Sequence, residues 1–178
     1  MFNLISKRYT SWFVGLSSYL TQSLTVGFFS MTLLLPNAAL AVEAGKPLPA
    51  LGMNEIQAIK GQYIYIDYWA SWCGPCRQSF PWMNALQAKL GSKGLKVVAV
   101  NVDAKRADAD KFLTHTPAEF TIAYDPLGES AKKLAIKTMP TSMLVSPEGQ
   151  VLFVHSGFRA EETAQLEAKI AAAMAVSN

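Results

Sequence analysis

The chain has two cysteines, Cys73 and Cys76, separated by only Gly74 and Pro75. A disulfide across two intervening residues closes a very small loop, and a crosslink restricts the unfolded chain less when its loop is short. Such a bond contributes little as a structural crosslink. The pair is better suited to thiol–disulfide exchange, in which one thiolate attacks a disulfide and the second thiol resolves the mixed disulfide.

Other uses of a cysteine pair fit the sequence less well. Structural zinc needs four ligands, and the only histidines, His115 and His155, stand at no spacing typical of a zinc site. Covalent haem attachment needs a histidine directly after the second cysteine, where this chain has Arg77. The sequence therefore predicts no metal and no cofactor, and an inert disulfide is the alternative that stays open.

The cysteine pair lies between a predicted strand and a predicted helix. The segment 62–69 (Q-Y-I-Y-I-D-Y-W) is rich in β-branched and aromatic residues, which predicts a central strand covered on both faces. Apolar residues recur at three- and four-residue steps over 75–90, which predicts an amphipathic helix. Cys73 would lie at the helix N-terminus, where unpaired N–H groups and the helix dipole lower the pKa of a thiol. We expect an exposed, reactive Cys73 and a shielded Cys76.

The rest of the sequence alternates predicted strands and helices. Strands are expected at 95–102, 120–124, 141–146 and 150–156, the last two as a hairpin, and helices at 103–114, 128–136 and 161–174. The charge run 103–111 (D-A-K-R-A-D-A-D-K) predicts a solvated helix face. This order is that of an α/β sandwich whose sheet begins parallel and ends antiparallel.

The amino-terminal residues differ in composition from the rest of the chain. Lys7 and Arg8 are followed by no Asp, Glu, Lys or Arg until Glu43, and the densest apolar run is 26–35. The sequence A-L-A at 39–41 matches the small-residue pattern that signal peptidase accepts. These features, in this order, predict a secretory signal peptide.

We therefore expect a signal peptide at 1–41 and one folded domain at 42–178. The alternative is an uncleaved anchor, with 12–35 as a membrane tether, because the uncharged stretch exceeds the ~20 residues that span a bilayer. Either arrangement places the domain across a membrane, free or anchored. The predicted domain holds 14 of the 16 basic residues and all 13 acidic ones, so it is nearly neutral. It also has no cluster of basic residues, which argues against nucleic-acid binding.

The segment W-A-S-W-C-G-P-C at 69–76 resembles the active site of thioredoxin. With R-Q-S-F-P at 77–81, M-P-T at 139–141 and the secretory leader, the chain is similar to the TlpA-like/ResA-like branch of the thioredoxin superfamily. The resemblance covers about 50–174. It implies an α/β thioredoxin-like fold, a mixed central sheet flanked by helices, with a TlpA-type inserted strand and helix between 103 and 124.

The resemblance also implies dithiol–disulfide exchange in the bacterial periplasm. Cys73 would be the nucleophile and Cys76 the resolving thiol of a redox-active disulfide, with Gly74 and Pro75 tuning its potential. Members of this branch often reduce disulfides in apocytochrome c or in other exported proteins. The G-V-x-G-x-P-E stretch of the dedicated cytochrome-maturation proteins is absent from this sequence.

Asp67, six residues before Cys73, matches the buried acid of thioredoxin. A carboxylate in an otherwise apolar strand is costly unless it has a task or a partner. Burial raises the pKa of a carboxyl, which makes Asp67 the expected proton acceptor for Cys76; a purely structural acid is the alternative. Ala99 stands where thioredoxin has a lysine beside this acid, so no lysine is expected to tune Asp67.

Pro140, between Met139 and Thr141, matches the proline that is cis in this superfamily. A cis bond there would bring the Met139 backbone close to Cys73, free to pair with a substrate strand. Trp72 is expected at the rim around Cys73. These four residues are the predicted substrate-binding residues.

The resulting prediction is an exported thiol–disulfide oxidoreductase that reduces disulfides in exported proteins and receives electrons from a membrane thiol donor. Gly74-Pro75 resembles thioredoxin, whose potential is about −270 mV, rather than the strongly oxidising type at about −120 mV. The alternatives are a disulfide oxidase or isomerase and a thioredoxin-fold module that only binds peptides.

Overall fold

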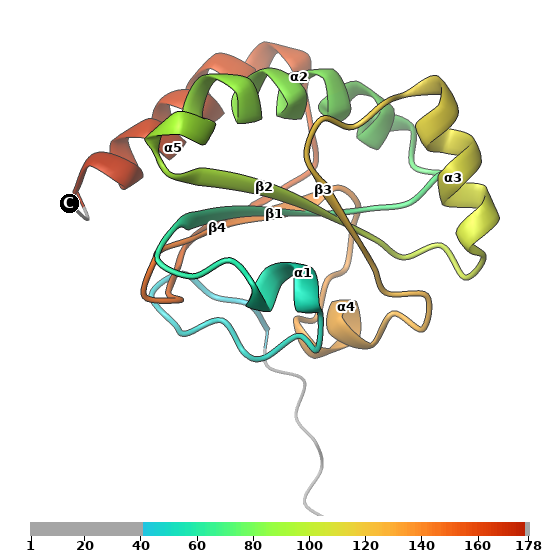
Figure 1. Ribbon diagram of the computed structural model, residues 1–178, viewed down its shortest axis with the longest axis horizontal. Helices are drawn as coiled ribbons and strands as arrows, with labels where there is room; N and C mark the ends of the chain where they lie inside the picture. The colour runs from blue at the N-terminus through green and yellow to red at the C-terminus, as the bar shows by residue number, and fades with distance from the viewer. Residues whose placement is uncertain (1–40, 177–178) are drawn as a thin grey trace, which may run out of the picture. The chain divides into compact units, whose positions relative to one another are not determined.

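The computed structural model describes residues 41–176, so the predicted signal peptide and the tether at 12–35 lie outside the described part, apart from residue 41. The described residues form a five-stranded sheet with helices on both faces (Figure 1). None of the helices among these residues is long and apolar enough to cross a membrane.

The sheet is mixed, as the sequence predicted. Its strands are β1 (Tyr63–Trp69), β2 (Leu95–Asn101), β3 (Thr121–Tyr124), β4 (Thr141–Val145) and β5 (Val151–Ser156), in the spatial order β3-β2-β1-β4-β5. The pairs β1–β2 and β2–β3 are parallel, whereas β4 is antiparallel to both β1 and β5. The expectation of a sheet that begins parallel and ends antiparallel is confirmed.

Helices cover both faces of the sheet. They are α1 (Asn54–Gln57), α2 (Gly74–Leu90), α3 (Arg106–His115), α4 (Glu129–Lys133) and α5 (Thr163–Val176), with the 3₁₀ turns η1 (Gly91–Lys93) and η2 (Ala160–Glu162). In Figure 1, α2 and α5 lie on one face of the sheet, and α1 and α4 on the other. The helix α3 and the strand β3 occupy the segment where an inserted helix and strand were expected.

Strand β1 separates two hydrophobic clusters, because its side chains alternate between the two faces of the sheet. All seven of its residues are buried. Tyr63, Tyr65 and Trp69 belong to the cluster under α2 and α5, and Ile64, Ile66 and Tyr68 to the cluster under α1. The same alternation puts Asp67 on the α2 face.

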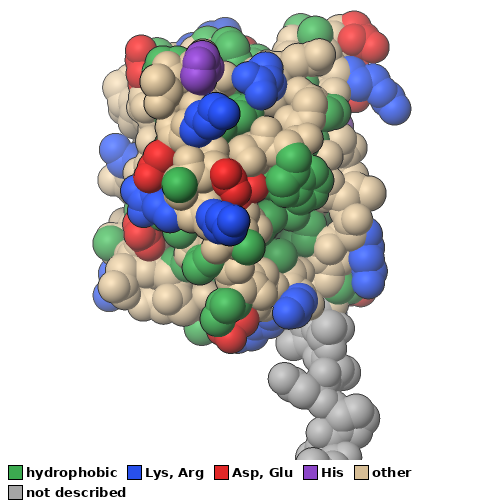
Figure 2. Space-filling model, turned by 90° about the vertical axis from the view of Figure 1, so that its right-hand side faces the viewer, with side chains coloured by type: hydrophobic (Ala, Val, Ile, Leu, Met, Phe, Trp, Pro, Cys, Tyr) green, Lys and Arg blue, Asp and Glu red, His purple; other side chains and the backbone are tan. Residues whose placement is uncertain are grey.

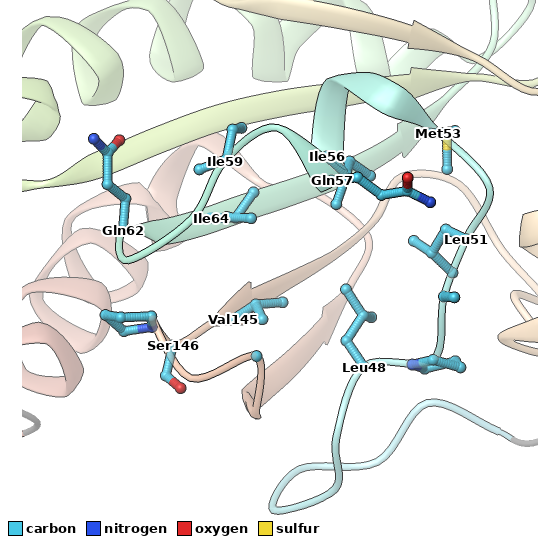
Figure 3. A pocket seen from close by; sticks show the side chains of 14 residues that line it. Leu48, Leu51, Met53, Ile56, Gln57, Ile59, Gln62, Ile64, Val145 and Ser146 are labelled. Carbon is cyan, nitrogen blue, oxygen red and sulfur yellow. The ribbon is translucent and has the colours of Figure 1, made fainter.

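A pocket of about 190 Å³ lies on the α1 side of the sheet (Figure 3). Its walls are mainly aliphatic, with Leu48 from the lead-in, Ile56 from α1, Ile64 from β1 and Val145 from β4. None of its lining residues is ionisable or a cysteine. The pocket therefore offers no ionisable group and no thiol, and the cysteine pair lies elsewhere, at the start of α2.

Candidate active site

The two cysteines form a disulfide at the start of α2. Cys73 is the N-cap, in extended backbone conformation, and Gly74 and Pro75 open the helix, where the missing N–H of proline needs no partner. The Cys73 Sγ accepts a hydrogen bond from the Cys76 backbone N–H at 3.2 Å. The same N–H and the helix dipole would stabilise a Cys73 thiolate in the reduced protein.

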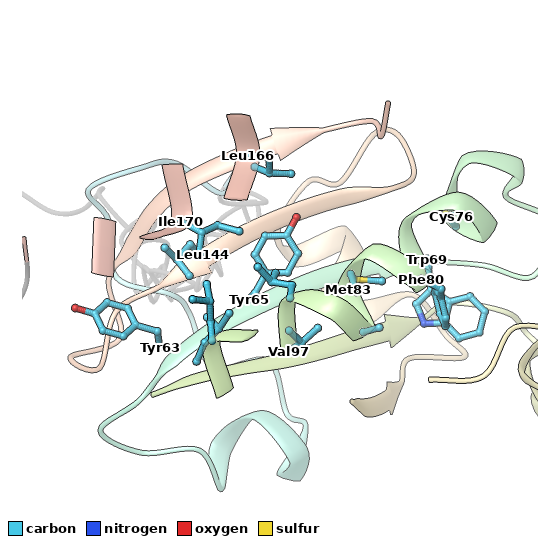
Figure 4. Close-up of a cluster of buried hydrophobic side chains, with 14 of the residues drawn as sticks. Tyr63, Tyr65, Trp69, Cys76, Phe80, Met83, Val97, Leu144, Leu166 and Ile170 are labelled. Carbon is cyan, nitrogen blue, oxygen red and sulfur yellow. The ribbon is translucent and has the colours of Figure 1, made fainter. Parts of the chain in front are cut away.

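The two cysteine residues differ little in exposure while they are bonded. Cys76 is fully buried and lies beside Trp69 and Phe80 (Figure 4), so the prediction of a shielded second cysteine is confirmed. The expectation of an exposed Cys73 is wrong for the disulfide form, in which this residue is 5% exposed. The bond to Cys76 holds the Cys73 sulfur against the same core cluster.

Asp67 is 3% exposed, and its Oδ2 atom has no hydrogen-bond partner. Its cross-strand neighbours are Ala99 on β2 and Ser142 on β4, neither of which carries a charge. Burial raises the pKa of Asp67 well above its usual value, because the charged form loses its hydration without gaining a partner. Asp67 is thus a carboxyl with an unusually high proton affinity on the face that holds Cys76.

A pair of hydroxyl groups lies on the same face as Asp67. The Tyr65 hydroxyl donates a hydrogen bond to Ser142 Oγ at 2.7 Å, and Ser142 stands directly opposite Asp67 in the β1–β4 ladder. Burial, and secondarily the Asp67 carboxylate, raise the pKa of Tyr65, so its hydroxyl stays protonated. The residues paired with Asp67 across the sheet therefore bring no positive charge to it.

Asp103 connects the cysteine loop to the end of β2, and the sequence interpretation missed this. Its carboxylate accepts hydrogen bonds from the Ser71 backbone N–H at 2.9 Å, the Ser71 hydroxyl at 3.0 Å and the Asn101 side-chain amide at 2.7 Å. Asp103 is buried and precedes α3, so placing it on a solvated helix face was wrong. The available signal was the parallel pairing: Trp69 and Asn101 end their strands in register, and Ser71 and Asp103 follow two residues later.

The predicted substrate-binding residues belong to two segments, the cysteine loop and the start of β4. Trp72 is 71% exposed. The Met139–Pro140 peptide bond is cis, Met139 is half-buried, and Thr141 is buried. Thr141 pairs with Tyr68 near the end of β1 from which the cysteine loop departs, so the sheet brings segment 139–141 to the same end of β1 as that loop.

A cysteine pair at the N-terminus of a helix, directly after the central strand of a mixed five-stranded sheet, defines the thioredoxin-like class of thiol–disulfide oxidoreductases. Within the part of the chain that the structure describes, no three Cys, His, Asp or Glu side chains are grouped to hold a metal ion.

Comparisons with known proteins agree with this class. The Redoxin family model matches residues 43–170. The thiol-disulfide oxidoreductase ResA of Bacillus thuringiensis subsp. konkukian is 31% identical over 133 residues, covering 71% of this chain and 76% of that protein. ResA of Bacillus subtilis is 29% identical over 126 residues, covering 71% and 67%.

Solved structures are similar as well. A protein from Chlorobium tepidum described as a thiol:disulfide interchange protein DsbE is 48% identical, with a TM-score of 0.71 over 75% of this chain and 99% of that one. StoA from Bacillus subtilis is 29% identical, with a TM-score of 0.53 over 61% and 82%. The chain belongs to the Redoxin family and is a thioredoxin-superfamily thiol–disulfide oxidoreductase of the ResA/TlpA type.

Proposed function

We propose that this oxidoreductase is exported and works as a reductase of disulfides in periplasmic or other extracytoplasmic proteins. The observation that carries the proposal is the position of Cys73 as N-cap of α2, with Cys76 buried one turn below it. In this proposal residues 1–41 are a signal peptide, or a tether through 12–35, and 42–178 are the catalytic domain. A membrane thiol donor restores the dithiol after each cycle.

The reaction transfers two electrons from the dithiol to the substrate. The Cys73 thiolate attacks one sulfur of the substrate disulfide, forming a mixed disulfide and releasing the other substrate sulfur as a thiolate that takes a proton from water. Cys76 then loses its proton, and its sulfur attacks Cys73 Sγ. The second substrate thiolate leaves and is protonated, and the Cys73–Cys76 disulfide seen here is the oxidised product.

Asp67 is the proposed acceptor of the Cys76 proton. Its raised pKa brings its proton affinity closer to that of a thiol, so the transfer costs less than it would to an ordinary carboxylate. Both groups are shielded from bulk water on the same side of the sheet. The proton is proposed to pass from Cys76 to Asp67 directly or through one bridging water molecule. Asp67→Asn should slow the release of reduced substrate without preventing formation of the mixed disulfide.

The substrate is proposed to bind between Trp72 and the segment of Met139, Pro140 and Thr141. The exposed indole provides apolar contact area at one side of the disulfide. The Met139 backbone can pair with an extended substrate strand. Gly74 and Pro75 are proposed to set the potential near that of thioredoxin.

Insulin reduction by the purified protein tests the activity. Wild type should reduce insulin, Cys73→Ser should be inactive, and Cys76→Ser should accumulate a mixed disulfide that can be isolated from periplasmic extract. If Cys73→Ser keeps its partners and its cellular role, the protein acts as a peptide-binding module instead.

The reduction potential tests the direction of electron flow. A value near about −270 mV supports a reductase, whereas one above about −180 mV assigns the protein to the oxidases or isomerases. Export is tested separately, by cell fractionation and by the N-terminal sequence of the mature protein. A start at Val42 is the expected result for cleavage, and an intact Met1 in the membrane fraction would indicate the tether.

A further inference from the structure

A polar cleft of about 450 Å³ lies between the active-site segment and α3. Two of its lining residues come from the active-site segment: Ser71, two residues before Cys73, and Arg77, directly after Cys76. Neither cysteine lines the cleft, but a chain segment seated in it would lie next to the segment that carries both cysteines. The other lining residues come from α3, within the inserted part of the fold.

One stripe of α3 forms the far wall of the cleft. Asp108, Lys111, Phe112 and His115 recur at three- and four-residue spacing, which places them along one side of the helix. Phe112 is buried and provides an apolar floor, whereas the three polar residues are exposed. A different pair on α3, Arg106 and Asp110, is joined by an ion pair at 2.8 Å and is absent from the cleft lining.

The cations in the cleft are not neutralised by ion pairs. Among the residues that the structure describes, neither Arg77 nor Lys111 forms one. The Arg77 guanidinium lies over the Phe112 ring, 5.1 Å from its centroid, an arrangement that leaves its N–H edge able to donate to a carboxylate. Figure 2 shows Lys and Arg side chains gathered near a histidine on the face that carries α3.

We propose that this cleft selects protein substrates with an acidic side chain close to the cysteine that is reduced. Arg77 and Lys111 bind the carboxylate, and the Phe112 ring beneath the Arg77 guanidinium helps to hold it in place. Asp108 is the only acid in the lining, so the cleft carries net positive charge within a domain that is almost neutral. The proposal rests on the proposed reductase function and adds a substrate class to it.

The test uses two synthetic peptides of equal length, each with one disulfide, in which either Asp or Lys flanks the attacked cysteine. Wild type should reduce the Asp peptide with a kcat/KM about three- to tenfold higher than that for the Lys peptide. This preference should become smaller in 0.5 M NaCl, because salt screens the attraction between exposed charges. Lys111→Glu should abolish or reverse it. Lys93→Glu is the matched control, since Lys93 is exposed, outside the cleft lining and changes the net charge equally.

Each outcome bears on one proposal. Equal rates for both peptides, or the same change in Lys93→Glu as in Lys111→Glu, would overturn the substrate preference while leaving the reductase intact. Failure of wild type to reduce either peptide or insulin would instead overturn the proposed function. An uncharged third peptide, reduced equally by wild type and Lys111→Glu, shows that the variant still folds and reacts.

Discussion

Asp67 is an acid held in the core with its Oδ2 atom unpaired, and this is its most informative property. A carboxyl kept there for structural reasons would be expected to have acquired partners, because an unpaired buried polar group costs about 1–3 kcal/mol. Its neighbours across the sheet are instead Ala99 and Ser142. The resulting high proton affinity suits a group that exchanges a proton with a buried thiol.

The raised pKa of Asp67 predicts a specific dependence of stability on pH. Between the unfolded pKa of about 3.9 and the higher folded pKa, the folded state binds more protons than the unfolded state, so stability falls as pH rises, by up to about 1.4 kcal/mol per pH unit. Asp67→Asn lacks this loss. Urea unfolding of the oxidised proteins should therefore show a stability advantage of Asp67→Asn that is smallest near pH 4 and grows as pH increases.

The exposed Glu119→Gln provides the control, and its advantage over wild type should not grow in this way. Parallel stability–pH curves for wild type and Asp67→Asn would mean that Asp67 titrates alike in both states. In that case Asp67 would not be suited to accept a proton from Cys76.

Trp72 predicts a loss of substrate binding without a loss of stability. Its side chain is 71% exposed, so Trp72→Ala should change the free energy of unfolding by less than about 0.5 kcal/mol. Exposed aromatic residues beside a reactive group are frequent binding hot spots, and we expect the KM for a protein disulfide to rise about three- to tenfold with little change in kcat. Reduction of a small aromatic disulfide should be nearly unaffected. An unchanged KM for the protein substrate would remove Trp72 from the binding surface.

At the scale of the elements, the loop that carries Cys73 depends on the neighbouring strand. Asp103 bonds to Ser71 through two of its three accepted hydrogen bonds, and Val102 N–H donates to the Trp69 carbonyl at 3.0 Å. The ends of β1 and β2 are thereby fixed to each other just before the disulfide. The position of Cys73 is set by this connection as well as by α2.

Two substitutions separate the parts of this connection. Asp103→Ala leaves the half-buried Ser71 and the buried Asn101 donors without their acceptor and should cost about 2–4 kcal/mol of unfolding free energy. Ser71→Ala removes only the hydroxyl bond and should cost about 1 kcal/mol. Urea unfolding measures both, and hydrogen exchange of the Ser71 amide should accelerate only in Asp103→Ala. Equal losses in the two variants would mean that the bonds from the Ser71 backbone and from Asn101 contribute nothing.

The elements that follow from local pattern were predictable, and those that depend on tertiary contacts were not. The buried strand β1 and the long helix α2 match their predicted segments to within one residue. The helix expected at 128–136 ends at Lys133 because Ala135 adopts a positive φ of 51°, which no local sequence rule anticipates for alanine. The four-residue α1 has no side-chain cap and too few residues for a periodic pattern.

The candidate site divides in the same way. The cysteines and Asp67 were predictable because their types are unusual for their positions in the sequence. The role of Asp103 was not, because the charges around it match a solvated helix and only the register of β1 and β2 brings it to Ser71. The burial of the Cys73 sulfur likewise depends on packing in the disulfide form.

At the scale of the whole molecule, two features of the fold act on the redox potential in opposite directions. The N-terminus of α2 favours the Cys73 thiolate and hence the reduced protein. The burial of Cys76, and of Asp67 on the same face of the sheet, disfavours thiolates in the core and hence favours the disulfide. A reductase requires the second contribution to exceed the first, because a protein whose reduced form is stabilised is an oxidant.

This balance makes a prediction that needs no substrate. Oxidation and unfolding form a thermodynamic cycle, so the difference in unfolding free energy between the oxidised and reduced proteins equals the difference in potential between the unfolded and folded dithiol, about 1.4 kcal/mol for each 30 mV. For a reductase the oxidised form must be the more stable one. Guanidinium unfolding of both forms, with Cys73→Ser/Cys76→Ser as a redox-insensitive control, should give a higher midpoint for the oxidised protein. A higher midpoint for the reduced protein would identify an oxidant, while leaving the family and the cysteine chemistry as they stand.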